Sequence, residues 1–212
     1  CYNVFAFNPN GTLKWKEGRD IADVPTLAKS PVIGYDGTIY YFSEDSLGAS
    51  VYSINKSGER NWRKPHLGRP LSFSSAISEN GTIYFGSSEG LKAMSPKGNF
   101  NWIFNIEDKD MLISPALDNQ GNIYTGYVKS DLTSKVKKGN LYSVSPDGVK
   151  RWNYTVSTST FSSPVIDKNG NIYFADDNYT LHALNSDGEE IWNFSTDYDG
   201  GKWGYIHPAI IT

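Results

Sequence analysis

One short pattern recurs five times along this 212-residue chain: a glycine followed four residues later by a tryptophan. The glycines are Gly11, Gly58, Gly98, Gly148 and Gly188, and the tryptophans are Trp15, Trp62, Trp102, Trp152 and Trp192. Successive copies are 47, 40, 50 and 40 residues apart. Self-similarity at such a period is the signature of a repeat architecture. The fold must therefore be built from stacked copies of one small motif.

Residues 162–194 show what this motif is. An apolar run, SSPVID, ends at Asn169-Gly170, and the alternating run NIYFA follows. LHALN, a turn that ends at Gly188, and EEIWNF complete the copy. Alternating runs rich in β-branched and aromatic residues predict strands, and Asn-Gly and Asp-Gly between them predict hairpin turns. Each copy therefore predicts four antiparallel strands, A to D, of one propeller blade.

The copies together predict an all-β fold. We expect a single β-propeller over residues 1–212, with four complete four-stranded antiparallel blades plus terminal partial blades, in a partial or five-bladed ring. The predicted pieces are 1–16, 30–64, 73–106, 113–156, 162–196 and 206–212. The two terminal pieces match strands C and D and strand A, so a blade made from both would lack strand B. We therefore expect part of a longer protein, or self-association through open blade edges.

Charge and composition exclude several classes of protein. A net charge of −3 gives no electrostatic case for a nucleic-acid partner. No apolar run approaches the ~18 residues of a membrane span. The one cysteine, Cys1, rules out an internal disulfide framework, and it is either a lipidation site or simply the first residue given. Six Asn-x-Ser/Thr triplets and many aromatic residues fit an extracellular, cell-surface or periplasmic protein.

The five repeat tryptophans predict how blades stack. The position that faces each tryptophan on strand C is always small: Ala6, Ser53, Ala93, Ser143 and Ala183. We expect each indole to pack between blades where the small residue leaves room. Because these tryptophans recur in every copy, their pattern favours a structural role over a sugar-binding role.

The pattern SPxIxxDGxIYxxxxxxxLYALNxDGxxxW resembles the PQQ-like repeat of quinoprotein alcohol dehydrogenase-like propellers, over essentially the whole chain. The resemblance implies a propeller of typically seven or eight blades, in a superfamily that also holds a scaffold lipoprotein of outer-membrane barrel assembly. Its dehydrogenases use a vicinal cysteine pair, a calcium ion and a catalytic aspartate beside the quinone. This chain has one cysteine and short loops, so we carry over no catalytic residue and expect no PQQ.

The loops are where we expect function. The A–B and C–D glycine turns leave one face of a meander blade, and the B–C and D–A connections leave the other. Length varies only among the second set, for example at 43–50 and 126–140. Because loops carry function on a rigid scaffold, the second face, called the loop face below, is the predicted binding surface.

Two loop segments supply candidate ligand-binding residues. The insertion GYVKSDLTSKVKKGN carries Lys129 and Lys137, which either contact an anionic polymer or lie on a solvated hairpin. The segment STDYDGGKWGYIH carries Tyr198, Trp203 and Tyr205 outside the repeat register. Trp203 is the one tryptophan that the blades do not require. It therefore either stacks on a sugar ring or a partner side chain, or caps the ring.

Metal binding has one weak pattern. Asp197 and Asp199, like Asp167 and Asn169, place oxygen atoms at alternate positions, as calcium loops do. Neither pair completes a ligand set, and an aspartate before glycine in a turn often bonds its own backbone. We therefore expect no cofactor and no metal, and keep calcium at Asp197 and Asp199 as the alternative.

These observations favour a non-enzymatic binding scaffold that presents its loop face to a protein or polysaccharide. One alternative is a fragment of a PQQ-dependent quinoprotein oxidoreductase without its catalytic loops. A second alternative is a lectin-like five-bladed propeller.

Overall fold

The computed structural model describes residues 4–17, 30–45, 48–65, 67, 74–106, 111–128, 139–156, 162–176 and 178–195. Within these ranges the chain forms antiparallel sheets joined by turns, and no helix. The prediction of an all-β fold made of four-stranded antiparallel blades is confirmed.

The strands form five sheets in chain order. The first sheet holds β1 (Val4–Phe7) and β2 (Leu13–Glu17). The second holds β3 (Val32–Ile33), β4 (Ile39–Asp45), β5 (Gly48–Ile54) and β6 (Arg60–Lys64). The third holds β7 (Ala76–Ile77), β8 (Ile83–Ser87), β9 (Gly90–Met94) and β10 (Phe100–Phe104). The fourth holds β11 (Met111–Leu112), β12 (Ala116–Leu117), β13 (Ile123–Val128), β14 (Gly139–Val144) and β15 (Lys150–Val156). The fifth holds β16 (Val165–Ile166), β17 (Ile172–Ala175), β18 (Thr180–Leu184) and β19 (Glu190–Ser195).

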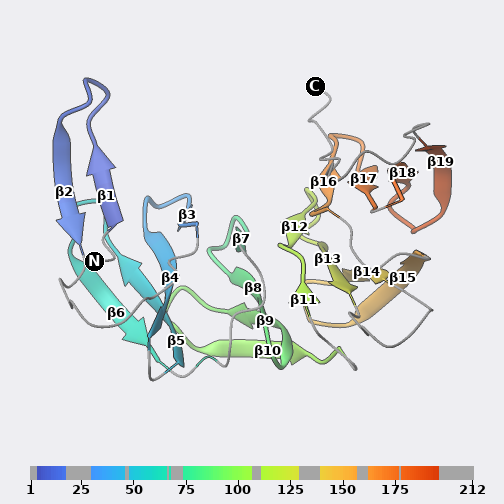
Figure 1. Ribbon diagram of the computed structural model, residues 1–212. Helices are drawn as coiled ribbons and strands as arrows, with labels where there is room; N and C mark the ends of the chain where they lie inside the picture. The colour runs from blue at the N-terminus through green and yellow to red at the C-terminus, as the bar shows by residue number, and fades with distance from the viewer. Residues whose placement is uncertain are drawn as a thin grey trace.

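Each complete sheet is a meander in which every strand pairs with the next one along the chain. The fourth sheet differs at strand A, because β11 and β12 both pair with β13, at its end and at its start. Strand A is short in each of the second to fifth sheets, where β3, β7, β12 and β16 contact one another in chain order. Figure 1 shows these strands on the inner side of an arc and the D strands on its outer side.

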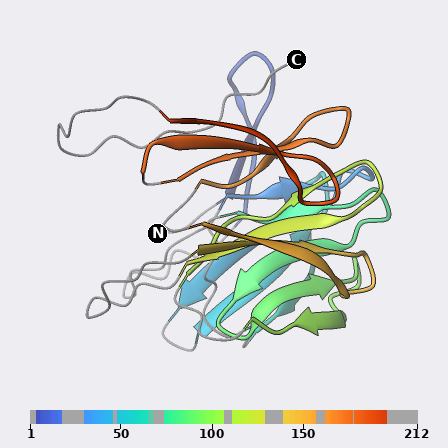
Figure 2. The same ribbon diagram turned by 90° about the vertical axis from the view of Figure 1, so that its right-hand side faces the viewer.

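The glycine turns have one shared geometry. In the turn between β5 and β6, the Gly58 amide donates to the Asn55 carbonyl over 3.0 Å, and Gly58 has φ of 87°. The Asn55 side chain accepts from the amides of Ser57 and Glu59. Glycine takes this left-handed conformation without steric cost, so the turn requires it. The A–B and C–D turns of the complete sheets gather at one side of the molecule, the right in Figure 2; we call this the turn face.

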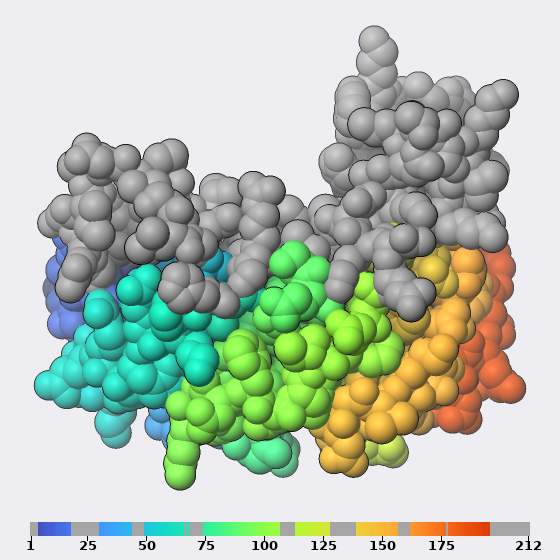
Figure 3. Space-filling model, turned by 90° about the horizontal axis from the view of Figure 1, so that it is seen from below, coloured from blue at the N-terminus to red at the C-terminus, as the bar shows by residue number. Residues whose placement is uncertain are grey.

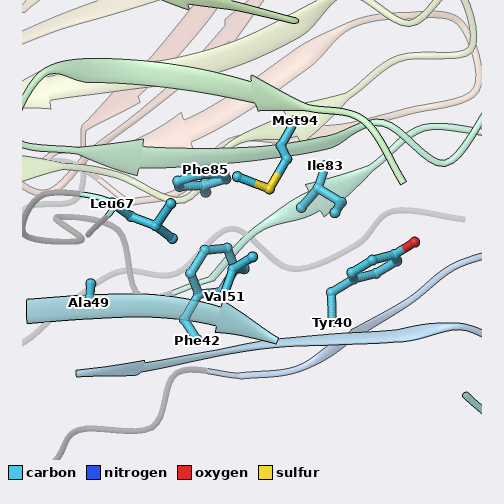
Figure 4. Packing of buried hydrophobic residues seen from close by; sticks show 8 residues of the cluster. All are labelled: Tyr40, Phe42, Ala49, Val51, Leu67, Ile83, Phe85 and Met94. Carbon is cyan, nitrogen blue, oxygen red and sulfur yellow. The ribbon is translucent and has the colours of Figure 1, made fainter. Parts of the chain in front are cut away.

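The core consists of layers between neighbouring sheets. One buried cluster joins Tyr40, Phe42, Ala49 and Val51 of the second sheet to Leu67 and to Ile83, Phe85 and Met94 of the third (Figure 4). Similar clusters join the third sheet to the fourth and the fourth to the fifth. The second to fifth sheets consequently pack against one another in chain order (Figure 3). Stability in such a chain is approximately a sum of nearest-neighbour interfaces.

The repeat tryptophans lie in these layers. Each pairs across the sheet with a small residue of strand C, as Trp102 does with Ala93. Each indole N–H donates to a turn carbonyl of the next sheet: Trp15 to Lys56, Trp62 to Pro96, Trp102 to Pro146 and Trp152 to Ser186, over 2.8–3.0 Å. A Cβ atom added at Gly58, Gly98, Gly148 or Gly188 would lie only 2.5–3.3 Å from the same indoles. The turn glycine is therefore needed twice, for its φ and for the close approach of the ring.

Candidate functional site

The predicted loop face consists of the B–C and D–A connections, and most of their residues lie outside the described ranges. The predicted ligand residues Lys129, Lys137, Tyr198, Trp203 and Tyr205, and the calcium candidates Asp197 and Asp199, lie outside the described residues. Their roles stay predictions. The polar groups that the structure does describe near this face lie between neighbouring sheets.

Four repeat positions correspond from one layer to the next, and we call each set of four an interblade niche. They are the residue two after the tryptophan of one sheet, a cross-strand pair on strands B and C of the next sheet, and the residue two before that sheet's tryptophan. The members are Glu17, Tyr41, Tyr52 and Arg60; Lys64, Phe85, Lys92 and Phe100; Phe104, Thr125, Tyr142 and Lys150; and Tyr154, Phe174, His182 and Glu190.

The first niche holds a buried acid. Glu17 is 9% exposed and accepts hydrogen bonds from the Tyr41 hydroxyl and from Nε of Arg60, the latter over 3.1 Å. The Arg60 guanidinium also lies 5.2 Å from the Tyr52 ring, which stacks on Tyr41. Burial first and the Glu17 carboxylate second raise the pKa of Tyr41, so its hydroxyl remains a donor. This niche joins the first two sheets through a charge pair with satisfied hydrogen bonds.

The second niche holds a buried cation. Nζ of Lys92 donates to the Leu67 carbonyl over 3.0 Å and lies 3.2 Å from the Glu89 carboxylate. The Phe100 ring lies 5.0 Å from this ammonium and 5.8 Å from that of Lys64. The ammonium groups of Lys64 and Lys92 thus both lie near the Phe100 ring, so cation–π attraction adds to the Lys92–Glu89 ion pair in this niche.

The fourth niche holds the single histidine of the described residues. Nε2 of His182 lies 3.1 Å from the Asp176 carboxylate, and its ring stacks on Phe174. Nδ1 lies 3.6 Å from the Glu190 carboxylate, which is too long for a hydrogen bond. The Tyr154 hydroxyl of the preceding sheet donates to Glu190. A histidine between two carboxylates has the composition of an acid–base site.

The acids of this niche remain ionised. Burial opposes ionisation of Asp176, but hydrogen bonds from His182 and from the amides of Thr180 and Asn178 lower its pKa overall. The Tyr154 hydroxyl, followed by Asn193, lowers the pKa of Glu190. His182 is only 8% exposed and lies between two sheets, so substrate cannot reach it. The arrangement therefore joins sheets, and we assign it no catalytic role.

Sequence reasoning missed the niches. A comparison between aligned copies could have found them. The residue two after the tryptophan of one copy and the residue two before the tryptophan of the next are Glu17 and Arg60 in one case, and Tyr154 and Glu190 in another. Both pairs combine groups that bond each other. The partners are 43 and 36 residues apart, so no local pattern connects them.

The oxygen atoms of Asp167, considered above as calcium ligands, are used within their own turn. The Asp167 carboxylate accepts from the amides of Asn169 and Asn171 over 2.8 and 2.9 Å, and from the Tyr173 hydroxyl over 3.1 Å. Burial is the largest single influence on the pKa of Asp167 and raises it. The hydrogen bonds together outweigh burial, so the pKa lies below its ordinary value. Its oxygen atoms thus close the turn. In the part of the chain that the structure describes, no group of three or more His, Cys, Asp or Glu is placed to hold a metal ion.

Comparison with known protein families gives a match over residues 27–210, to the family described as the SMP-30/gluconolactonase/LRE-like region. The chain belongs to this family. Propellers of this family, called SGL, have six blades. Membership contradicts the prediction of a non-enzyme, because the family includes gluconolactonase, which is an enzyme. The specific PQQ-like repeat is not supported by this match.

A curated relative is an uncharacterized protein, YxaL, from Bacillus subtilis strain 168. It is 28% identical over 182 residues, which cover 86% of this chain and 42% of the relative. The chain thus spans less than half the length of that protein.

Solved structures share the fold at low sequence identity. Virginiamycin B lyase from Staphylococcus aureus has a TM-score of 0.70 at 12% identity, over 93% of this chain and 64% of that one. BamB from Moraxella catarrhalis has a TM-score of 0.62 at 15% identity, over 92% and 58%. A protein of unknown function from Bacteroides caccae has a TM-score of 0.56 at 11% identity, over 92% and 75%. These likenesses establish the propeller fold alone. Among the described residues no helix is long and apolar enough to cross a membrane.

Proposed function

We propose that the loop face binds a carbohydrate-derived ligand and that the whole protein hydrolyses a cyclic ester. Membership of a family that includes gluconolactonase supports the reaction class. The aromatic and lysine residues predicted for the loop face support the ligand class, because rings such as that of Trp203 stack on sugar rings. An extracellular, cell-surface or periplasmic location fits this ligand and belongs to the proposal.

The choice of the loop face rests on one observation: the turns of the opposite face, the turn face, are all built alike. All nine described glycine turns are closed by the same bond, from the glycine amide to the carbonyl three residues earlier, over 2.9–3.0 Å. Four of the five C–D turns also receive an indole. Backbone and side-chain groups of the turn face thus hold the turns closed and bind neighbouring sheets to each other. Variation in length and chemistry is left to the loop face, where ligand specificity can differ between relatives.

Proton release measures the proposed reaction. Hydrolysis adds one water across the ester, breaks the acyl C–O bond and yields a hydroxy acid that releases one proton at neutral pH. We expect the protein to accelerate alkali uptake in a pH-stat with at least one lactone of a panel of sugar-derived five- and six-membered rings. A panel in which every lactone opens at the buffer rate contradicts the proposed reaction.

Two matched variants test the site. Trp203→Ala should lower kcat/KM by about tenfold or more, the effect of losing one stacking interaction of about 1.4 kcal/mol. Tyr35→Ala is the control, because Tyr35 is 77% exposed on a turn between β3 and β4. Equal rates for both variants and the parent would show that Trp203 is not part of the site.

A second candidate ligand is an anionic polysaccharide. Lys129, Lys135, Lys137 and Lys138 fall in one ten-residue stretch of the loop face, which favours a polymer of acidic sugars. Polygalacturonate should co-sediment with the protein at low salt and be released at high salt. Lys129→Gln/Lys137→Gln should weaken this association, and Lys97→Gln/Lys168→Gln on the turn face should not. The quinoprotein alternative, the lectin-like alternative and a protein ligand stay predictions.

A further inference from the structure

The connection between β17 and β18, on the loop face, contains a tyrosine whose backbone conformation suits glycine. Tyr179 has φ of 58°, which lies in the left-handed region. Eleven of the described residues have a positive φ, and the other ten are glycines. A bulky side chain in this region costs conformational free energy, whereas glycine avoids that cost. Among the described residues, Tyr179 is therefore the one exception to the use of glycine at such positions.

The turn at Tyr179 has the same geometry as a glycine turn of the same sheet. The Tyr179 amide donates to the Asp176 carbonyl over 3.2 Å, and the Asp176 carboxylate accepts from the amides two and four residues later, over 2.9 and 3.0 Å. In the turn between β16 and β17, the Gly170 amide donates to the Asp167 carbonyl, and the Asp167 carboxylate accepts from the amides two and four residues later. Tyr179 thus stands where the equivalent turn has Gly170, so glycine would fit this turn.

The surroundings hold the turn at Tyr179 in place. Oδ2 of Asp176 lies 3.1 Å from Nε2 of His182, and both side chains are buried. The carboxylate that closes the turn is consequently fixed by the sheet below it as well as by the turn amides. A residue in a sparsely populated conformation persists where the surrounding structure determines it, and such residues cluster at ligand sites.

Tyr179 also lies at the end of the fifth sheet from which a predicted ligand-binding segment continues. Thr180, the next residue, pairs with Ser195 across β18 and β19, and their hydroxyl oxygens are 2.9 Å apart. Residues 196–206 follow directly in the chain and include Trp203. Tyr179 is partly exposed. An aromatic ring at this end of the sheet can contact a ligand at the loop face.

From these observations we propose that Tyr179 is a binding residue of the loop face and that its ring stacks on the sugar-derived ring of the ligand. This assignment rests on the proposed function, because it adds a residue to the same site. Tyrosine costs conformational free energy at a position that glycine fits. Its contribution to binding accounts for that cost, since stability is commonly lower where a site requires a strained residue.

Two substitutions at Tyr179 separate the backbone from the ring. Tyr179→Asn removes the ring and keeps the turn, since asparagine tolerates positive φ, and Tyr179→Phe keeps a ring. Tyr35→Asn is the matched control, because Tyr35 lies in a hairpin turn of the opposite face and is 77% exposed. Relief of strain should leave Tyr179→Asn with a Tm equal to or above that of the parent. A Tm several degrees below the parent would show that Tyr179 is kept for packing, and would overturn the proposal.

Kinetics in the pH-stat measure what the ring contributes. With the sugar-derived lactone that the parent opens fastest, Tyr179→Asn should raise KM about three- to tenfold with a smaller change in kcat, as for the loss of one stacking contact. Tyr179→Phe should restore most of the lost affinity, and Tyr35→Asn should match the parent. An active parent with an unchanged KM in Tyr179→Asn would overturn this assignment alone. A parent that opens no lactone would overturn the proposed function, and the assignment with it.

Discussion

Residues at one repeat position take different chemistry according to what they face in the next sheet. Glu17 and Tyr154 are equivalent, yet one is a carboxylate that accepts from Arg60 and the other a hydroxyl that donates to Glu190. In both niches a hydrogen bond joins the two neighbouring sheets. Because a buried polar group without a partner costs about 1–3 kcal/mol, either half of a niche constrains the other.

The Glu17–Arg60 pair gives a prediction in free energy. Arg60→Ala should lower the free energy of unfolding by about 1.5–3 kcal/mol, because it leaves the buried Glu17 carboxylate without its cation. In a Glu17→Gln background the same change should cost clearly less. Urea unfolding of the four chains of this double-mutant cycle measures the coupling. Costs that simply add would mean that the two side chains act independently.

The fourth niche gives a prediction in pH. The folded pKa values of Asp176 and Glu190 lie below their ordinary values. The unfolded chain therefore binds more protons in this range, so stability is full above about pH 4.3 and is lost as pH falls through the folded pKa values. We expect the urea midpoint to fall between pH 5 and pH 3, and to fall less in Asp176→Asn. An equally steep fall of the urea midpoint in Asp176→Asn would show that Asp176 does not contribute to the pH dependence of stability.

At the scale of elements, the C–D turn is both a hairpin and a docking site. The hairpins could be predicted from sequence, because alternation and glycine position act within a few residues. The docking carbonyl could not, since Trp102 and Pro146 are 44 residues apart. The split strand A of the fourth sheet was missed for a related reason: β11 pairs with the far end of β13, next to an insertion that only this copy has.

Paired glycine variants separate these two roles. Gly148→Asn and Gly170→Asn place the same side chain at nearly the same φ, 83° and 84°. An added Cβ atom would lie 2.7 Å from the Trp102 ring at Gly148, but 3.9 Å from its nearest neighbour at Gly170. Gly148→Asn should therefore lower Tm by several degrees more, as expected for overpacking by about 1–3 kcal/mol. Equal melting temperatures would mean that the indole contact contributes little.

For the whole molecule, repetition sets the architecture. Five sheets follow one another around an arc, with strands A inside and the tryptophan layers between them (Figure 1). The fold class could be predicted because each copy repeats the same local signals. Function could not, because the predicted ligand-binding residues, such as Lys129 and Trp203, occur once and have no second copy to compare. Family membership, rather than pattern, corrected the expectation of a non-enzyme.

The central claim is that ligand binds at the loop face, and hydrogen exchange tests it most directly. The chain would be compared with and without the hydroxy acid formed from the lactone that it opens fastest, which persists during labelling. We predict slower exchange in peptides that cover 126–140 and 196–206, and unchanged exchange in the turns at 34–37, 95–98 and 145–148. Protection confined to those turns, with none at the loop segments, would contradict the claim.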